Sequence, residues 1–547
     1  MGLLASASVR LFLVAWTLFS LFFATNIVRE HYPAFTLIER GDFRCDEYLD
    51  WHADIFLHTD GHSYVGNNVL GSVIAAVPLF VFDPILDRIE AHSKRELAAS
   101  PTPPEAVYQT KYPNRANLFR LAKAAGKDLR LGASAVVTSV FLMAPLSALF
   151  TVLVFQFLLR RGVPGPRAVW LALLFGFGTP IWYRTAHLNH NMFLMEALFA
   201  AFLVLFREPG RAFAHSTAQR ALAGLLLGVA VALDYAGVIP AVVLGLYFLW
   251  TRRGEAGWGA ALRESVPALL AALPPILFLF WTQKIMYGGW FTPGQFVMRP
   301  VNYTEVGMKG ISWPSLEVLL KNFVAPGWGL YTFGPLLLVA LWPAPRDRES
   351  AWILPRRERR WVLALVASFL IWNAMNVYSL MQFNSGFRYL LPIVPFAFLQ
   401  ASDRLAVMTR PVLAALSAVV LAHGLVLCMT REVNDTEKIL RDRAVALGVS
   451  ETELPGYWRT MLTETPIPLS YRRVFHGAPP ENVQGLQLPW LAVLAQTRPD
   501  DTRLRNPFLP LLLMAGAGSL CWLLWRAGDR SARLARLARL DRTRAVR

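Results

Sequence analysis

Apolar runs of about twenty residues recur along the whole chain, and short polar linkers separate them. As an α-helix, a run of this length is about 30 Å long, which matches the hydrocarbon core of a bilayer. The first run, residues 11–28, is too long for the core of a signal peptide and lacks a small-residue cleavage site, so we expect a retained first span. The pattern predicts an all-α polytopic membrane protein with about 12–13 transmembrane helices.

Positive charges mark one side of this predicted bundle. Four linkers and the C-terminal tail are rich in arginine: 160–167, 207–220, 251–264, 345–360 and the residues after Trp525. Linkers that carry Lys and Arg stay on the cytoplasmic side of a membrane, so we expect these segments inside. The polar linkers that alternate with them are then expected outside: 29–66, 184–191, 287–327, 381–388 and 430–506.

The alternation of inside and outside linkers holds only if two apolar segments do not cross the membrane as single continuous spans. Residues 221–250 must form two short spans with a break at Asp234, since a single helix of that length would be about 45 Å long. Residues 68–85 contain Pro78 and Pro84, and a full crossing there would put every later linker on the wrong side. We therefore expect residues 68–85 to form a shallow or partly inserted helix.

The predicted spans divide the chain into three parts. We expect residues 1–429 to form one transmembrane module with residues 29–66 as its polar first external loop. Residues 430–506 carry charges, prolines and an amphipathic stretch, which favours a small external subdomain before the last span. Residues 507–547 hold the last transmembrane helix and a basic cytoplasmic tail, which either lies on anionic lipid head groups or only sets the topology.

Composition narrows the class of function. The net charge is +17, but the Lys and Arg residues are concentrated in the linkers and the tail. This is the distribution of a membrane protein, and we expect no nucleic-acid partner. Cys45, Cys428 and Cys521 are far apart in the sequence, so neither a disulfide framework nor a CxxC metal site is available.

The first external loop has a dense set of titratable side chains. It contains eight Asp or Glu residues, three Arg residues and four of the ten histidines. Asp46 and Glu47 are adjacent acids, and a carboxylate at a membrane surface can take a proton from a hydroxyl acceptor, so both are candidate catalytic residues. Alternating residues flank Asp60 and Gly61, which predicts a β-hairpin with a two-residue turn and gives Asp60 a structural role.

Further polar side chains lie on the same predicted side of the membrane. Carboxylates and histidines next to a span usually face a cavity or a partner. Five of them are candidate substrate-binding residues: Asp54, His62, His187, His190 and Glu196. Arg388 precedes an apolar run and is followed by Tyr389, and a guanidinium there suits a lipid phosphate. The Asp and His spacing matches no closed metal site, so we predict no metal and no cofactor, while a divalent cation is left open.

Six short motifs resemble a known family: GDFRCDEY, DGHSY, GTPIWYRTAHLNHN, GLLLGVAVALDYAG, APGWGLYTFGPLLL and GFRYLLPIVPF. In this order they look like the bacterial GT-C glycosyltransferases, and most like the branch similar to protein O-mannosyltransferases, over roughly residues 11–399. The resemblance implies sugar transfer from a polyprenyl-phosphate carrier, with Asp46 as the catalytic carboxylate and Arg388 as a contact to the donor phosphate. Many relatives have a Lys-Pro or Pro-Gly element after the hairpin, where this chain has Gly66-Asn67-Asn68-Val69.

These observations predict an inverting membrane glycosyltransferase that uses a first-loop Asp as base. Its expected partners are a polyprenyl-phosphate-linked sugar donor, membrane lipid and an acceptor that is a lipid, a glycan or a protein. The expected location is the bacterial cytoplasmic membrane, with the active site facing the periplasm. Two alternatives stay open: a multi-span transporter or lipid flippase, and a non-catalytic scaffold with the GT-C shape.

Overall fold

The computed structural model describes residues 6–99, 113–208, 213, 215–298, 306–325, 327–342, 353–384, 386–430, 488–497, 501–506 and 508–545. Within these residues the chain is mainly helical, with one two-stranded sheet and two isolated β-bridges. Most of the predicted external subdomain, residues 430–506, lies outside the described residues. The prediction for that segment therefore stays untested.

The elements of the first third are α1 (Ala7–Leu21), α2 (His31–Arg40), η2 (Asp46–Tyr48), β1 (Ile55–Leu57), β2 (Ser63–Val65), α3 (Leu70–Ala99), α4 (Pro113–Ala124), α5 (Asp128–Thr138), the π-helical η3 (Ser139–Met143) and α6 (Ala144–Arg160). The middle contains α7 (Gly165–Phe177), α8 (Pro180–Thr185), α9 (His190–Leu205), α10 (Thr217–Leu233), η4 (Tyr235–Gly237), α11 (Val238–Tyr287), η5 (Gly294–Phe296) and α12 (Leu316–Val324). The last part contains α13 (Leu330–Phe333), η6 (Pro335–Leu341), α14 (Arg356–Met375), η8 (Val377–Asn384), η9 (Leu391–Ile393), α15 (Val394–Val407), α16 (Arg410–Thr430), α20 (Pro489–Thr497), η10 (Thr502–Arg505) and α21 (Leu509–Ala545).

Several of these helices can cross a bilayer. By length and composition, five of the described helical segments qualify: Leu70–Ala99, Asp128–Arg160, Tyr235–Tyr287, Arg410–Met429 and Leu509–Asp529. Four shorter helices are also apolar: Ala7–Leu21, Gly165–Phe177, His190–Leu205 and Thr217–Leu233. The prediction of an all-α membrane protein is confirmed at this level, whereas the number of about 12–13 spans stays a prediction.

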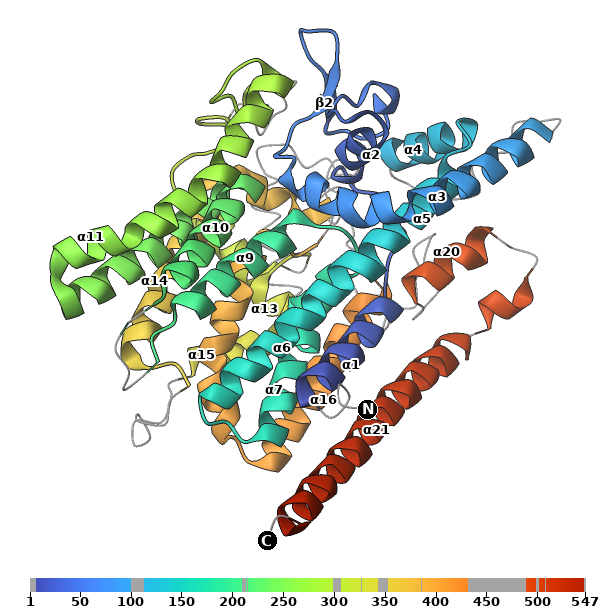
Figure 1. Ribbon diagram of the computed structural model, residues 1–547. Coiled ribbons are helices and arrows are strands. Elements are labelled where there is room, and N and C mark those ends of the chain that lie inside the picture. The colour runs from blue at the N-terminus through green and yellow to red at the C-terminus, as the bar shows by residue number, and fades with distance from the viewer. Residues whose placement is uncertain are drawn as a thin grey trace.

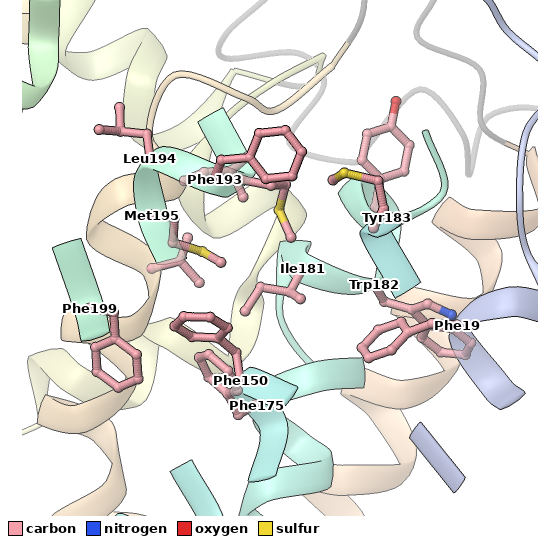
Figure 2. Packing of buried hydrophobic residues seen from close by; sticks show 14 of the residues in the cluster. Phe19, Phe150, Phe175, Ile181, Trp182, Tyr183, Phe193, Leu194, Met195 and Phe199 are labelled. Atoms are coloured by element: carbon pink, nitrogen blue, oxygen red, sulfur yellow. The ribbon is translucent and has the colours of Figure 1, made fainter. Parts of the chain in front are cut away.

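The core of the bundle is built from aromatic rings. Helices α1, α6 and α7 pack side by side (Figure 1). Figure 2 shows the rings of Phe150, Phe175 and Phe199, from α6, α7 and α9, gathered together, and their centroids lie 6.2–6.3 Å from that of Phe199. Large rigid rings give each helix pair a defined contact, which matters in lipid because packing rather than water exclusion holds helices together there.

Small residues allow α10 and α11 to approach closely. A Cβ atom at Gly228 would lie 2.5 Å from the carbonyl oxygen of Ala272, and one at Gly224 would collide with Ala268 one turn away. Within α11, Gly257 has a φ of 80°, which divides the segment into two helices. The predicted break at Asp234 is confirmed, because α10 ends at Leu233 and the short helix η4 precedes α11.

The arginine-rich linkers meet at one end of the bundle. Arg161 pairs with Glu208 at 3.3 Å, and Arg207 pairs with Glu255 at 3.0 Å, so three of these linkers are joined by ion pairs. The backbone N–H of Ile353, before α14, donates to Asp403 near the end of α15, so the linker before α14 also lies at this end. Residues 29–66 lie at the opposite end, as the alternation of linkers predicts, and we call the two ends the arginine-rich end and the first-loop end.

Helix α3 stays at the first-loop end. The segment that follows it returns to the same loop, since Asn117 donates to the backbone oxygen of Asp50 at 2.9 Å and Lys127 donates to the hydroxyl of Tyr48 at 3.3 Å. In Figure 1, α3 lies beside α2, α4 and α5. Although its length would allow a crossing, these contacts agree with the predicted shallow helix, and its exposed apolar stripe, which includes Phe80 and Val81, is suited to lipid.

The hairpin of the first loop differs from its prediction in the turn. Strands β1 and β2 are antiparallel, and the N–H of His58 donates to the oxygen of His62 at 2.8 Å. This bond closes a turn of three residues, Thr59-Asp60-Gly61, and not the predicted two, and Gly61 adopts the left-handed φ of 86° that the turn needs. The structural role of Asp60 is confirmed, since it accepts from the N–H of His62 at 2.9 Å and the hydroxyl of Tyr64 at 3.0 Å.

The first and last described helices lie against each other. Helix α21 runs along α1 and extends beyond it as one long helix (Figure 1). Arg10 of α1 is buried, pairs with Asp529 and donates to the backbone oxygen of Trp525 at 3.2 Å. Its guanidinium also lies 4.6 Å from the centroid of the Trp525 ring. Arg10 of α1 is therefore held by α21 through its Nη1 atom and through its contact with the Trp525 ring.

Candidate functional site

Five ionisable side chains meet at the first-loop end, and we call them the buried ionic cluster. Nδ1 of His190 lies 2.6 Å from Oε1 of Glu30, and Nε2 of the same ring lies 3.3 Å from Oδ2 of Asp234. Arg29 donates to Oδ2 of Asp54 at 2.8 Å and lies 3.5 Å from Oε1 of Glu30. Glu30 and His190 are buried and Arg29, Asp54 and Asp234 are half-buried, so their charges interact more strongly than at a fully solvated surface.

Each member sits where a regular element begins or ends. Glu30 precedes the first residue of α2, and His190 is the first residue of α9, where the side chain of Asn189 caps the helix by accepting from the N–H of Asn191 at 2.8 Å. Asp234 ends α10 and accepts from the N–H of Ala236 at 2.9 Å. Helix termini are held by hydrogen bonds, so these side chains have defined positions.

Opposite charges keep the carboxylates of the cluster ionised. Burial alone would raise the pKa of Glu30, but the hydrogen bond with His190 and the charge of Arg29 lower it below its usual range. Burial would also raise the pKa of Asp54, but the charges of Arg29, His52 and Arg388 lower it. The pKa of Asp234 is lowered by His190 against the same effect of burial.

Arg388 and Tyr389 adjoin this cluster. Arg388 is close enough to influence the charge of Asp54, and Tyr389 is within electrostatic range of Arg29. The backbone N–H groups of both residues donate to Oε1 of the buried Gln382 at 2.9 Å, which fixes the turn that carries them. The guanidinium of Arg388 lies 4.7 Å from the centroid of the Tyr389 ring. Of the predicted site residues, the structure thus brings together Asp54, His190, Arg388 and Tyr389.

Asp46, Glu47 and His62 belong to a second, more exposed group. Asp46 accepts from the N–H of Ser63 at 2.6 Å and lies 2.9 Å from Nδ1 of His62, while Glu47 pairs with Arg40 at 2.6 Å. The side chain of Asp46 is 46% exposed. Burial would raise the pKa of Asp46, but the hydrogen bonds with the Ser63 N–H and with His62 lower it. These bonds join η2 to β2 and orient the carboxylate.

The two remaining predicted residues are buried near α9. His187 lies in the turn between α8 and α9 and is 8% exposed, and Glu196 lies six residues after His190 within α9 and is 5% exposed. Oε1 of Glu196 has no hydrogen-bond partner among the described residues. Tyr183 of α8 lies near this turn, and Figure 2 shows its hydroxyl pointing away from the packed rings. The structure does not join Glu196 to the buried ionic cluster by a hydrogen bond or an ion pair.

Glu30, Arg29 and Asp234 complete the cluster but were not among the predicted site residues. The available signal was the Arg29-Glu30 pair at the end of an apolar run, where ionised groups are costly unless they are paired or functional. Glu30 and His190 are 160 residues apart in the sequence, so no local pattern reveals that they lie close in space. Within the described part of the chain, no group of three or more His, Cys, Asp or Glu is arranged to hold a metal ion.

Comparisons with known proteins return no relative. No family model matches the chain, and no curated protein and no solved structure matches it either.

Proposed function

We propose that this protein is a glycosyltransferase of the bacterial cytoplasmic membrane that moves a sugar from a polyprenyl-phosphate carrier to an acceptor on the periplasmic side. The observation that carries the proposal is the buried ionic cluster beside Arg388 at the first-loop end. It combines carboxylates able to accept a proton with a guanidinium suited to a phosphate, where the chain leaves the apolar bundle. The similarity of the sequence motifs to GT-C enzymes supports the same chemistry.

Arg388 is proposed to bind the donor phosphate. A guanidinium presents several N–H donors in a plane and stays charged at every physiological pH, so it can hold both the bound donor and the released lipid phosphate. The Gln382 bonds to the backbone of Arg388 and Tyr389 fix the start of this side chain. Charge builds up on the phosphate as it leaves, so stabilisation by a cation matters more here than protonation by an acid.

A first-loop carboxylate is proposed to act as the base. The sequence motif favours Asp46, with Glu47 beside it, and the geometry adds Glu30, which lies in the same buried ionic cluster as Asp54. In the reaction the acceptor hydroxyl attacks the anomeric carbon, its proton moves to the carboxylate, and the bond to the lipid phosphate breaks with its electron pair. A single displacement of this kind inverts the anomeric centre.

The experiment reconstitutes the purified protein in liposomes with a synthetic polyprenyl-phosphate sugar and a mixture of lipid, glycan and peptide acceptors. An enzyme releases polyprenyl phosphate in an acceptor-dependent manner, whereas a flippase only moves labelled donor between leaflets and a scaffold does neither. Release by the wild-type protein supports the proposal, and donor movement without release overturns it.

Two variants then identify the base. Loss of a general base costs about 100-fold to 10,000-fold in rate, so either Glu30→Gln or Asp46→Asn should reduce release by this factor while donor binding is retained. Glu96→Gln, an exposed glutamate of α3, is the matched control and should behave as wild type. Wild-type rates in both Glu30→Gln and Asp46→Asn would remove the first-loop base from the mechanism.

A further inference from the structure

We infer that His190 and Asp234 are positioning residues that orient the carboxylate of Glu30 toward the acceptor hydroxyl. This inference rests on the proposed function and deepens it, because it distinguishes Glu30 from Asp46 by the groups that hydrogen-bond to each carboxylate. It assigns a role to two side chains that do not themselves need to touch the substrate.

The first step is the direction of the hydrogen bonds. His190 lies between two carboxylates, with Nδ1 2.6 Å from Glu30 and Nε2 3.3 Å from Asp234. An ionised carboxylate can only accept, so both ring nitrogens must carry a proton when Glu30 and Asp234 are charged. His190 is then a fixed cation that donates in two directions, and the ring is held in one plane by residues from two other segments.

The second step concerns which oxygen of Glu30 is held. The contacts from both His190 and Arg29 are made to Oε1, at 2.6 Å and 3.5 Å. Neither cation contacts Oε2, so we place the acceptor proton on this oxygen. By contrast, each oxygen of Asp46 has its own side-chain or backbone donor, Oδ1 the N–H of Ser63 and Oδ2 His62. The difference favours Glu30 as the proton acceptor, because both of its cationic partners hold the same oxygen.

The third step is the anchor of the chain. Asp234 sits in the break between α10 and η4, where its Oδ1 accepts from the N–H of Ala236 while Oδ2 faces His190. The backbone of the break thus fixes Asp234, Asp234 fixes the ring, and the ring fixes Glu30. The orientation of Glu30 thus depends on Asp234, which follows it by about two hundred residues in the sequence.

The proton balance of the step is simple. The acceptor proton moves to Oε2 of Glu30 while the acceptor oxygen bonds to the anomeric carbon and the phosphate leaves with the electron pair of the broken bond. His190 keeps both of its protons throughout, so it acts through charge and hydrogen bonding and not as a proton carrier. Its positive charge keeps Glu30 ionised before the step, together with that of Arg29.

These roles predict a change in pH dependence. The charged and titratable groups around Glu30 and His190 are Arg29, Asp234, Asp54 and His31, with Arg388 beyond Asp54. The pKa of Glu30 is lowered by its partners against the effect of burial, so the acid limb of the wild-type rate profile should lie below the usual carboxyl range. Removal of His190 leaves burial less opposed, so this limb should move to higher pH.

The test measures kcat and the donor KM from pH 4 to 9 for the wild type, His190→Gln, Asp234→Asn and Asp234→Glu. The wild type should show no acid limb from Glu30 in this range. We expect His190→Gln to lower kcat by roughly 10-fold to 100-fold, less than loss of the base itself, with donor KM nearly unchanged and an acid limb that falls within the measured range. Asp234→Asn should show the same changes to a smaller extent, and Asp234→Glu should restore part of the rate. His423→Gln changes a buried histidine of α16 outside the buried ionic cluster; it is the control for a purely structural loss and should keep the wild-type pH profile.

The outcomes separate the inference from the proposed function. A wild-type protein that releases no polyprenyl phosphate contradicts the proposed function itself. An active wild type whose His190 and Asp234 variants keep the wild-type pH profile overturns the positioning chain while the enzyme proposal stands. If neither His190→Gln nor Asp234→Asn folds, the chain has a structural role and the inference fails as well.

Discussion

The close approach of α10 and α11 predicts a measurable penalty for one methyl group. We consider Gly228→Ala, because a Cβ at this position would lie 2.5 Å from the carbonyl oxygen of Ala272 and 2.8 Å from its Cα. Ordinary contact begins at 3.4 Å, so the two backbones must separate by about 0.9 Å. The obstacle is main chain and cannot rotate away, unlike the end of a long side chain.

The magnitude follows from two opposing effects. Overpacking of this kind costs about 1–3 kcal/mol, and replacing a helical glycine by alanine gains about 1 kcal/mol from propensity. Gly245 in α11 provides the matched control, since a Cβ there meets no atom within 4 Å. Gly245→Ala should therefore be neutral or stabilising, and the difference between the two variants isolates the packing cost of about 1–3 kcal/mol.

The assay is thermal unfolding of the purified variants in one detergent, followed by sugar transfer at a temperature where both are folded. Gly228→Ala should unfold several degrees below Gly245→Ala, and it should also transfer more slowly because the displaced helix α10 carries Asp234 at its end. Equal unfolding temperatures for the two variants would refute the packing argument. A destabilised variant with full activity would refute the link from this helix crossing to the buried ionic cluster.

Two further predictions concern the donor and the orientation. Arg388→Lys keeps the charge but loses the planar fork, so its affinity for the proposed donor should fall. Arg388→Ala should weaken equilibrium binding of the donor by about 10-fold to 100-fold. An unchanged affinity in Arg388→Ala would reduce Arg388 to an interfacial anchor. Trp313→Cys at the first-loop end and Gly254→Cys at the arginine-rich end should react with a membrane-impermeant thiol reagent from opposite sides, against a low background because all three native cysteines are buried. Labelling of both positions from the same side would contradict the shared external site.

The sequence predicted the parts of the fold that depend on local patterns. Apolar runs and arginine-rich linkers were sufficient for the helical class and for the break at Asp234, because both follow from the cost of charges and chain breaks within lipid, whereas the shallow insertion of residues 68–85 stays a prediction. The hairpin was also found, but its turn was one residue longer than predicted. A glycine at positive φ permits both turn lengths, and the bond between His58 and His62 decides between them.

The composition of the site was harder to predict. His190, Asp54 and Arg388 were recognised from their positions at the ends of apolar runs, but Glu30 was treated only as part of an acidic loop. Its importance comes from contacts with His190, which is 160 residues away, and such contacts depend on how the helices pack. The hydrogen bonds of Asp46 to Ser63 and His62 were equally hidden, since the hairpin register fixes them.

The contact between α1 and α21 has a consequence for biogenesis. Arg10 is synthesised well before its partner Asp529, which follows 519 residues later. At about 5–20 residues per second, roughly half a minute or more passes before that partner leaves the ribosome. During this time the guanidinium of Arg10, which the folded protein buries, lacks its partner Asp529, and a chaperone or a protease can recognise it. Pairing of Arg10 therefore requires α21, and a chain truncated before α21 should be degraded even if its first-loop end is folded.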